Sequence, residues 1–461
     1  MRRAAEGDRT ERLLTGWGRT APSRATVVPA GGPDAMASEL LAGGPRGVLP
    51  RGLGRSYGDV AQNGGGIVLD MSASRGIERL DEEAGEMTAL AGTSFDELLR
   101  TIVPRGWFMP VTPGTRFVTL GGAIANDVHG KNHHLDGSVG DHVTSFDLLT
   151  PDGTVRTVTP GDEVFDATLG GLGLTGVIVR ATLRLLPIET ASVRVDTDRA
   201  PDLDALMSLM STGDDAYRYS VAWIDCLARG RSLGRGVLTR GDHAIREEVE
   251  RSRDPLAYAP RALGAVPPGV PNVVVPLGIR AFNELWFRKA PRRQRGRIEP
   301  LTPFFHPLDA IAGWNRLYGR HGFVQHQFVV PLEEERVVQT ALELLSSAGA
   351  ASFLAVLKRF GRGRGMLSFP EPGWTLALDI PAAQPGLAEL LDRIDLAVAG
   401  AGGRVYLAKD SRLAPALLPV MYPDLDRWRA VRERLDPTHV LRSDLERRLG
   451  LDASARKVVN R

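Results

Sequence analysis

Cysteine is almost absent from this sequence. The 461 residues contain only Cys226, which excludes an intramolecular disulfide and any cysteine-rich metal site. Lysine is nearly as scarce, and the 57 Lys and Arg residues include only five lysines: Lys131, Lys289, Lys358, Lys409 and Lys457. Where arginine supplies the ordinary positive charges, a retained lysine indicates a position that needs a compact ammonium or an amine able to lose its proton.

Long apolar runs and a strong net charge are also absent. No run of about 18 apolar residues is free of charge, so the sequence predicts no membrane-spanning helix. The N-terminal segment is interrupted by charges throughout, and we expect no export signal there. A net charge of +2 gives no electrostatic reason to expect nucleic acid or a polybasic membrane contact. These observations favour a small-molecule ligand.

Glycine, in contrast, is abundant, with 52 residues gathered in short clusters. The main clusters are RGLGRSYGD (51–59), PGTRFVTLGGAIANDVHGKNHH (113–134) and LGGLGLTG (169–176). Gly52 and Gly54 allow successive N–H groups to converge on an anion such as a diphosphate. A Rossmann fingerprint is not matched, because its third glycine would fall on Tyr57. Each loop alone is also explained as a plain turn, but three together predict one extended cofactor that carries a diphosphate.

The pattern of expected strands and helices predicts an α+β fold. Strands are expected in 64–71, 87–92 and 176–187, with a hairpin turn at 151–153. A helix is predicted after Ser94, where Glu97 completes a capping box, whereas 113–134 shows little helical or strand periodicity. A second region begins near Ser192, and 255–276 is expected to be a long loop or lid, or a simple surface connector.

Three histidines at positions 129, 133 and 134 raise the possibility of a zinc site. Histidines four residues apart can share one helix face, as His129 and His133 do in sequence. Gly130 weakens such a helix, however, and no glutamate follows His129 as in HExxH. We therefore expect no metal, and keep a zinc hydrolase built on His129, His133 and His134 as an alternative from a different class.

Taken together, these segments resemble the vanillyl-alcohol-oxidase class of FAD enzymes, and within it the family that oxidises polyprenylphosphoryl ribose. The resemblance covers almost the whole chain, and the combination of motifs is more specific than any one of them. The matching motifs are GWGRTAPS (16–23), RGLGRSYGD, AQNGGG (61–66), PGTR, GGAIA, HGKNHH, GLTG, ELWFRK (284–289), FHPLD (305–309), WNRLYG (314–319), GFVQHQF (322–328), LSFPEPGW (367–374) and AKDSR (408–412).

The resemblance implies a split FAD-binding domain around an inserted α+β substrate domain. The FAD domain would comprise 1–191 and the C-terminal segment 404–461, and the substrate domain 192–403. The implied cofactor-binding residues are Arg51, Gly52, Leu53, Gly54, Arg55, Ser56, Tyr57, Gly58, Asp59, Gly114, Thr119, Leu120, Gly121, Gly122, Asn126, Asp127, Val128, His129, Ile178 and Tyr406.

Three positions depart from the pattern of related enzymes. Many members of the class attach the flavin covalently to a histidine of the first glycine loop, but Arg55 stands here, so we expect non-covalent FAD. Ala377 replaces a pocket cysteine that covalent inhibitors attack in some members, which should leave turnover intact. Asn126 replaces a flavin-lining cysteine, which predicts a more polar flavin environment.

The resemblance also implies the catalytic residues Lys409, His129, Tyr57, Lys131, Gln325, Gln327 and Lys358. Oxidation of an alcohol needs a hydride acceptor, which the flavin provides and no side chain does. Lys409 is our best candidate for polarising the flavin or accepting the hydroxyl proton, with a salt bridge to Asp410 or a neighbouring carboxylate as the alternative. His129 is expected to act as the base or to orient the ring, with a hydrogen-bonded core imidazole as the alternative.

The strand 322–328 offers two amides to a sugar. Gln325 and Gln327 alternate, so both point to one face of the strand and His326 to the other. Amides donate and accept hydrogen bonds and therefore suit sugar hydroxyls, although a solvent-facing strand explains the pattern as well. Lys131 and Lys358 suit a lipid-linked phosphate or substrate hydroxyls, or else are exposed charges.

The implied reaction is oxidation of the 2′-hydroxyl of decaprenylphosphoryl-β-D-ribose to the 2′-keto sugar. This is the first half of an epimerisation that supplies the arabinose donor for cell-wall arabinan. An NADH-dependent short-chain reductase would complete it. The apolar stretch 266–275 fits a lipid tail, which a soluble polyol would not need, and a peripheral membrane contact is also expected. We expect a cytoplasmic or periplasmic enzyme at the cell envelope, the family favouring the periplasm. The alternative is an FAD-dependent alditol or aldonolactone oxidase with a soluble substrate.

Overall fold

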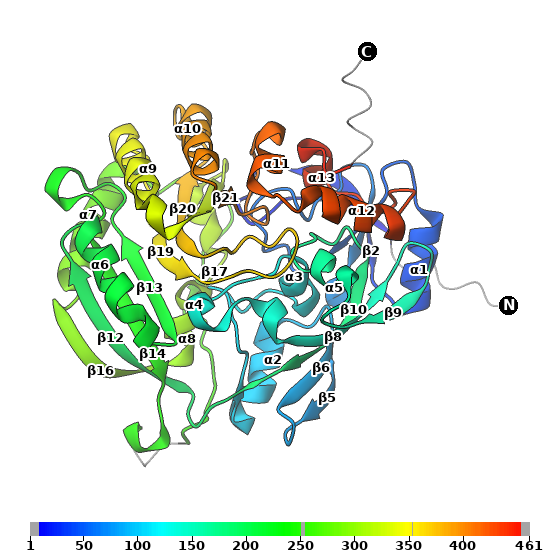
Figure 1. Cartoon of the computed structure of the whole chain (residues 1–461), viewed down its shortest axis with the longest axis horizontal. Coiled ribbons are helices and arrows are strands. Elements are labelled where there is room, and N and C mark those ends of the chain that lie inside the picture. The colour runs from blue at the N-terminus through cyan, green and yellow to red at the C-terminus, as the bar shows by residue number, and fades with distance from the viewer. Residues whose placement is uncertain (1–8, 250–253, 353, 453–461) are drawn as a thin grey trace.

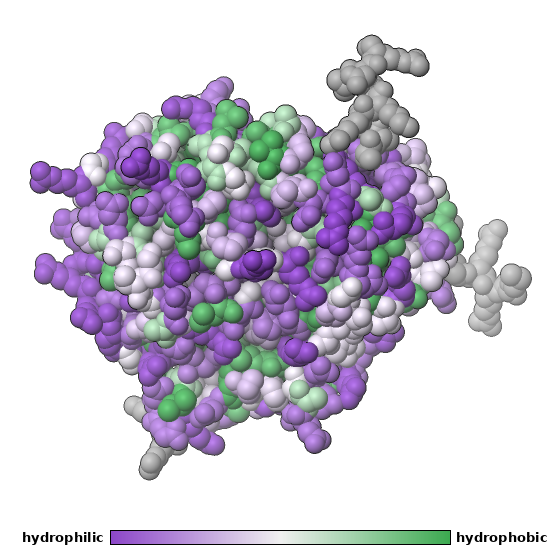
Figure 2. Space-filling view, in the orientation of Figure 1, coloured by the Kyte–Doolittle hydropathy of each residue, from purple (hydrophilic) through white to green (hydrophobic). Residues whose placement is uncertain are grey.

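The computed structural model describes residues 9–249, 254–352 and 354–452 (Figure 1). In Figure 1 the N-terminal sheets and the C-terminal helices lie on one side of the molecule, and a large sheet with its helices lies on the other. In the same orientation, Figure 2 shows a mainly hydrophilic face on which hydrophobic residues form small separate patches. This α+β architecture agrees with the fold class predicted from the sequence.

The first sheet has four strands in the order β1-β2-β4-β3. Its strands are β1 (Thr10–Leu14), β2 (Ser23–Pro29), β4 (Ile67–Asp70) and β3 (Val48–Arg51), and helix α1 (Pro33–Ala42) connects β2 to β3. Strands β2 and β3 both run parallel to β4. The first glycine loop follows β3 directly, so the end of this strand sets where the loop begins.

The second sheet is antiparallel, in the order β5-β6-β10-β8-β9. Its elements are β5 (Ile77–Asp81), β6 (Glu86–Leu90), β10 (Val177–Arg184), β8 (Val143–Leu149) and β9 (Val155–Val158), with helices α2 (Phe95–Ile102), α3 (Leu120–Ala125), α4 (His133–Asp136) and α5 (Glu163–Thr168) in the connections. The hairpin turn between β8 and β9 is confirmed, as is the capping box, because Ser94 Oγ accepts from Glu97 N and Glu97 Oε2 accepts from Ser94 N. The prediction of little regular structure in 113–134 is wrong in part: Thr119 Oγ1 accepts from Gly122 N and begins α3.

The large sheet has eight strands in the order β16-β12-β14-β13-β19-β20-β18-β21. They are β16 (Arg293–Pro300), β12 (Ser192–Ala200), β14 (Gly236–His243), β13 (Tyr219–Ile224), β19 (Ala355–Phe360), β20 (Gly373–Pro381), β18 (Phe323–Val330) and β21 (Arg404–Val405). Helices α6 (Leu203–Gly213), α9 (Glu335–Ala348) and α10 (Leu387–Gly400) pack against it. The predicted alternation in β18 is confirmed, because Gln325 and Gln327 face a cavity while His326 Nε2 lies 2.7 Å from Asp395 Oδ1 of α10.

The segment before α7 (Pro276–Lys289) has little regular structure, as the sequence predicts. Within its described part, from residue 254, it contains the short strand β15 (Gly264–Ala265), which pairs with β17 (Ile311–Ala312). The remaining short elements are β7 (Trp107–Phe108), β11 (Leu186–Pro187), α8 (Leu301–Phe305) and α11 (Leu418–Met421).

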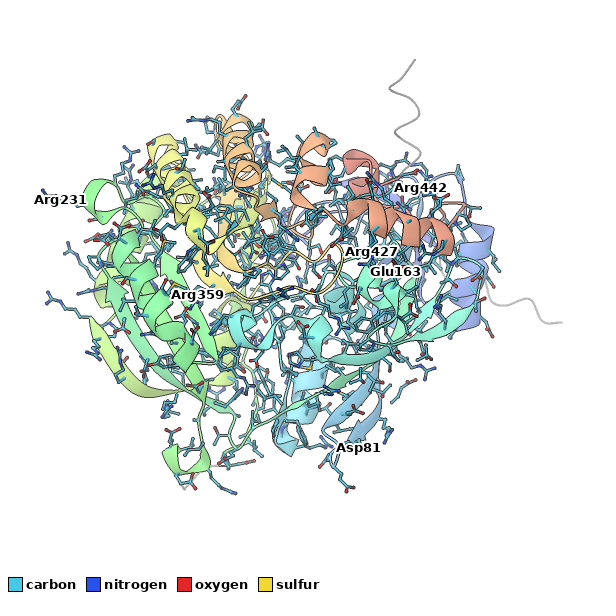
Figure 3. The ribbon with its side chains drawn as sticks, viewed as in Figure 1. Asp81, Glu163, Arg231, Arg359, Arg427 and Arg442 are labelled. Atoms are coloured by element: carbon cyan, nitrogen blue, oxygen red, sulfur yellow. The ribbon has the colours of Figure 1, made fainter. Side chains whose placement is uncertain are left out.

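The C-terminal helices α12 (Leu425–Leu435) and α13 (Asp444–Leu449) return to the N-terminal sheets. Trp428 Nε1 donates to the carbonyl of Ala167 at 3.0 Å, and Arg427 of α12 pairs with Glu163 of α5 at 3.1 Å (Figure 3). Strand β21, in contrast, adds to the edge of the large sheet through β18. The chain after residue 403 therefore contacts both the N-terminal sheets and the large sheet, and the division into domains stays a prediction.

Candidate functional site

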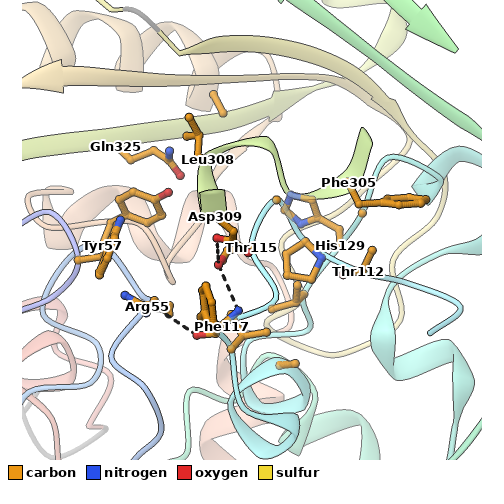
Figure 4. Close-up of a pocket in the computed structure, with 18 of the residues that line it drawn as sticks. Arg55, Tyr57, Thr112, Thr115, Phe117, His129, Phe305, Leu308, Asp309 and Gln325 are labelled. Atoms are coloured by element: carbon orange, nitrogen blue, oxygen red, sulfur yellow. Dashed lines mark hydrogen bonds between the residues drawn. The ribbon is translucent and has the colours of Figure 1, made fainter. Parts of the chain in front are cut away.

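A cavity of about 970 Å³ lies between the glycine-rich loops and the free face of the large sheet (Figure 4). The predicted catalytic residues all line it. The predicted cofactor-binding residues on its wall are Gly52, Leu53, Gly54, Arg55, Ser56, Tyr57, Gly114, Thr119, Gly121, Gly122, Asn126, Val128, His129, Ile178 and Tyr406. Residues from six separate stretches of the sequence thus meet around one space.

The first glycine loop presents backbone amides without partners. Its carbonyl groups are used, because Trp17 N donates to Ser56 O at 2.7 Å and Gly18 N donates to Tyr57 O at 3.1 Å. The N–H groups of residues 53–56, in contrast, donate to nothing within the described ranges. Gly54 has a φ of 63°, which turns the chain so that these donors converge. Such a nest of amides fits a diphosphate.

The wall beyond this loop also fits a flat cofactor. Gly114 would place a Cβ in open space, with nothing within 4 Å, and Gly52 lies so close to Thr119 that a Cβ would meet its Oγ1 at 2.2 Å. Tyr406 Oη donates to the carbonyl of Asn126 at 2.8 Å, while the buried Asn126 Oδ1 has no partner. An unpaired acceptor on this wall fits an N–H group of a flavin ring.

Arg51, Gly58 and Asp59 of the first loop do not line the cavity. Arg51 donates to the carbonyls of Thr15 and Ala61 at 2.7 and 2.5 Å and so fixes the base of the loop. Asp59 accepts two 2.9 Å hydrogen bonds from Arg448 of α13. These residues support the loop on the side that faces away from the cavity.

Gly58 packs against the segment that carries Lys409, because a Cβ at this position would lie 1.8 Å from Asp410 O. Arg448 also reaches Asp410 Oδ2 at 2.8 Å. The salt bridge between Lys409 and Asp410 that we kept as an alternative is therefore not formed: Asp410 pairs with Arg448 instead.

Leu120 and Asp127 of the second loop also lie away from the cavity, in the protein interior. Asp127 Oδ1 accepts from Ser138 Oγ at 2.6 Å and from Gly140 N at 3.1 Å, and its Oδ2 accepts from Ser368 Oγ. The side chain joins three segments and does not reach the space where a ligand would lie.

The opposite wall presents hydrogen-bonding groups without partners. Gln327 Nε2 donates to Thr375 Oγ1 at 3.0 Å and lies 3.2 Å from His129 Nε2. The amide oxygens of Gln325 and Gln327 and the Nδ1 of His129 are buried and have no hydrogen-bond partner among the described residues. Because Gln327 donates to Nε2, the proton of a neutral His129 is assigned to Nδ1. Buried polar groups left unpaired in this way indicate a polar ligand.

Four of the five lysines line the cavity: Lys131, Lys289, Lys358 and Lys409. Burial lowers the pKa of Lys131 to about 8, with Glu299 opposing this effect. Burial, together with Lys409 and Lys131, lowers the pKa of Lys358 well below its usual value. Burial and the nearby lysines 358 and 409 also hold the pKa of His129 well below 6.5, so this imidazole is neutral. Such perturbed groups in one cavity are typical of a catalytic site.

Asp379 is a candidate site residue that the sequence analysis missed. It lies opposite Gln325 in the β18–β20 ladder and accepts a hydrogen bond from that amide. Burial raises the pKa of Asp379, while the hydrogen bond from Gln325 and the charge of Lys409 lower it. Burial likewise lowers the pKa of Lys409, and Asp379 opposes this. Only the strand register reveals Asp379, since its sequence context is an ordinary buried strand.

Tyr57 completes this cluster. Figure 4 shows its ring beside Gln325 on one side of the cavity, with His129 on the other. The Lys409 amine lies 5.4 Å from the centre of the Tyr57 ring and 5.9 Å from that of Tyr406. Within the described part of the chain this amine has no hydrogen bond or ion pair, so it is available to a ligand.

The three histidines considered for zinc do not converge on one point. His133 Nδ1 accepts from Gly361 N at 3.1 Å, His134 Nε2 contacts the carbonyl of Tyr217 at 3.0 Å, and His129 contacts Gln327. The one group of metal-ligand type found among the described residues is elsewhere, at His439, Glu446 and Asp452. The geometry therefore does not support a zinc hydrolase built on these histidines.

Comparison with known proteins agrees with the cavity chemistry. Residues 42–159 match the FAD binding domain family. The decaprenylphosphoryl-β-D-ribose oxidase of Mycolicibacterium smegmatis is 43% identical over 453 residues, which cover 96% of this chain and 98% of the relative. An uncharacterized protein in the mprA 5′ region of Streptomyces coelicolor is 45% identical over 77% of this chain and 99% of its own. An L-gulono-1,4-lactone dehydrogenase of Mycobacterium tuberculosis is 24% identical over 86% of this chain and 89% of its own.

The domain match makes FAD the cofactor, and the oxidase relative spans nearly the whole chain. The protein is therefore an FAD-dependent oxidoreductase, and it belongs to the decaprenylphosphoryl-β-D-ribose oxidase family.

Proposed function

We propose that the protein oxidises the 2′-hydroxyl of decaprenylphosphoryl-β-D-ribose to the 2′-keto sugar. The observation that carries this proposal is the convergence of three partly buried lysines and two glutamine amide oxygens, unpaired among the described residues, on the cavity that faces the first glycine loop. Amides suit the hydroxyls of a pentose, and ammonium groups suit a phosphate. The name of the M. smegmatis relative supports the same substrate.

FAD would be held without a covalent bond, by residues of all three glycine loops. The free amides of residues 53–56 would bind the diphosphate, and Gly114, Asn126 and Tyr406 would line the flavin. Arg55 stacks over the Trp17 ring at 4.0 Å and donates to the Phe117 carbonyl at 3.1 Å, so it braces the cavity wall. When bound, the flavin supplies the hydride acceptor that the side chains lack.

Lys409 is the residue we assign to the hydroxyl proton. Its amine has no hydrogen bond or ion pair among the described residues, and burial lowers its pKa to about 8, so a part of it is neutral near physiological pH and able to accept a proton. His129 is neutral and receives a hydrogen bond at Nε2, which suits a role in orienting the ring or the sugar. Gln325, Gln327 and Lys358 would bind the sugar hydroxyls and the phosphate.

We also propose a peripheral contact with a membrane, through α7 and the segments beside it. Large apolar side chains are exposed to solvent on these segments, including Leu277 at 80% exposure and Leu263 at 79%. The others are Val273, Val275, Phe282, Leu285, Trp286 and Ile311. Within the described ranges, no helix has both the length and the apolar character needed to cross a bilayer. The contact would thus lie on the surface of the membrane.

The 2′-keto product has to be reduced from the opposite face to give the arabinose epimer. An NADH-dependent short-chain reductase at the cell envelope would supply this step. Such a partner suits the chemistry of the product, since a reduction needs a hydride donor and the FAD enzyme acts on the sugar as a hydride acceptor.

Anaerobic bleaching of the bound flavin tests the proposed function. A polyprenylphosphoryl ribose should bleach the absorbance within a single turnover, whereas free alditols and aldonolactones should not. Bleaching by the free polyols alone would favour the alternative, a soluble-substrate oxidase like the lactone dehydrogenase relative. Bleaching by neither would remove the assignment to this substrate class.

The split domain arrangement is also a proposal. Contacts such as Trp428 to Ala167 support placing 404–461 with 1–191, around the substrate domain 192–403. The cavity would then lie between the two domains, with the cofactor bound on the FAD-domain side and the sugar on the substrate-domain side.

A further inference from the structure

One face of the large sheet forms a wall of the cavity and changes from polar to apolar along its length. A single row of paired residues crosses five neighbouring strands, and each of its members lines the cavity. In order from β18 to β14 the row consists of Gln327, Ala377, Val356, Trp223 and Val237. Only the first of these is polar enough to bind a sugar.

The row has the length of a small lipid fragment. Adjacent strands lie about 4.8 Å apart, so its four steps span about 19 Å. A second row lies beside the apolar end, where Val221 pairs with Thr239 and Thr239 pairs with Thr197. These residues also line the cavity. Val221 therefore widens the apolar surface beside the row, whereas the two threonines add hydroxyl groups there.

Other apolar residues line the cavity as well, together with the charged Lys289, Arg297 and Glu299. Phe304 lies beside Lys131, whose amine is 4.2 Å from the centre of its ring, and Trp286 lines the cavity near the end of α7. Trp286 stacks with Phe282 at 6.0 Å on the exposed face of α7. Apolar residues therefore line the cavity both beside Lys131 and beside the exposed apolar surface of α7.

We propose that the row Ala377, Val356, Trp223 and Val237, here called the isoprenoid track, binds the first isoprene units of the substrate. The inference rests on the proposed function and adds the place of the lipid. An isoprenoid chain attached to the phosphate is the occupant that matches a row of uncharged side chains that begins next to Gln327. A free polyol has no apolar part to cover it, and burial of the chain there would add binding energy in proportion to its area.

Two substrates that differ only in the length of the lipid distinguish the contribution of the isoprenoid track from that of the rest of the site. Farnesylphosphoryl ribose reaches along the track, whereas ethylphosphoryl ribose ends at its beginning. We expect Trp223→Ala and Val237→Asn to lower kcat/KM for the farnesyl substrate by about 10- to 50-fold, from roughly 50 to 100 Å² of lost apolar contact. The loss should appear in KM, and kcat/KM for the ethyl substrate should stay within about twofold.

Val420→Asn on α11 is the matched control, since it makes the same change at an exposed valine. It should affect neither substrate. Equal losses for both substrates in the track variants, or no loss for either, would overturn the inference. Failure of wild-type protein to oxidise either substrate would count against the proposed function instead. In that case, the affinity for farnesyl phosphate, measured by tryptophan fluorescence, still tests the track. An affinity of Val237→Asn equal to that of wild type would refute the inference.

Discussion

Asp127 offers a quantitative test of how the segment carrying His129 is held. Its side chain is fully buried and receives hydrogen bonds from Ser138, Gly140 and Ser368. Burial nevertheless raises its pKa from 3.8 to about 6, against the effect of these hydrogen bonds. The folded state therefore binds the proton more tightly than the unfolded chain does.

The sign of the effect follows from this difference. Because the folded pKa is the higher one, the contribution of Asp127 to stability is greatest at low pH and is lost as pH rises from about 4 through 6. A pKa difference of about 2 corresponds to about 3 kcal/mol in the free energy of unfolding. Between pH 4.5 and pH 8 the free energy of unfolding should lose roughly 2 kcal/mol of this contribution.

The perturbation is Asp127→Asn, which keeps the Oδ1 acceptor for Ser138 and Gly140 but does not titrate. Urea unfolding of the FAD-loaded protein at pH 4.5 and pH 8 gives the two free energies. From the lower to the higher pH, wild type should lose about 2 kcal/mol relative to the variant. Exposed Asp204→Asn is the control and should behave as wild type. An identical pH dependence in wild type and Asp127→Asn would refute the reasoning.

The other predictions concern the cofactor and Lys409. Lys409→Ala should retain FAD but lose flavin reduction in single-turnover mixing, and near-normal reduction would remove the residue from the reaction. Asp379→Asn removes the negative charge that favours the protonated amine of Lys409, so the rise of kcat/KM with pH should move to lower pH. An unmoved profile would show that the carboxylate does not act on this amine. Arg448→Met leaves Asp59 and Asp410 without their shared cation, and should lower stability by about 2 kcal/mol and weaken FAD retention. Unchanged melting and FAD content would contradict that role. Acid precipitation should release the flavin into the supernatant because Arg55 forms no covalent link, and colour kept in the pellet would disprove this.

Local patterns predicted the local structure well. The capping box at Ser94 and the alternation of Gln325 and Gln327 depend on neighbours a few residues apart, and the structure confirms both. The scarcity of lysine also carried information, because four of the five lysines line one cavity. The helix α3 was missed because its glycines have low helix propensity, whereas the Thr119 cap and packing of the segment against β6 and β10 favour it.

Sequence motifs were less able to separate residues that face the cofactor site from those that support it. Asp127 and Asn126 are neighbours in the same motif, yet Asn126 lines the cavity and Asp127 lies behind it. Asp379 had no motif, and only its pairing with Gln325 across two strands places it beside Lys409.

By itself, the sequence determined the chemistry of this protein: backbone donors for a diphosphate, a few lysines and two amides on one strand face. Tertiary structure decided which of these groups meet, since the glycine loops at 51–59 and 113–134 are far along the chain from strand β18 and the 408–412 segment. It also set the pKa values, because desolvation depends on how completely the packed fold removes a charge from water. A sequence fixes which groups are present, but burial and strand register fix their surroundings.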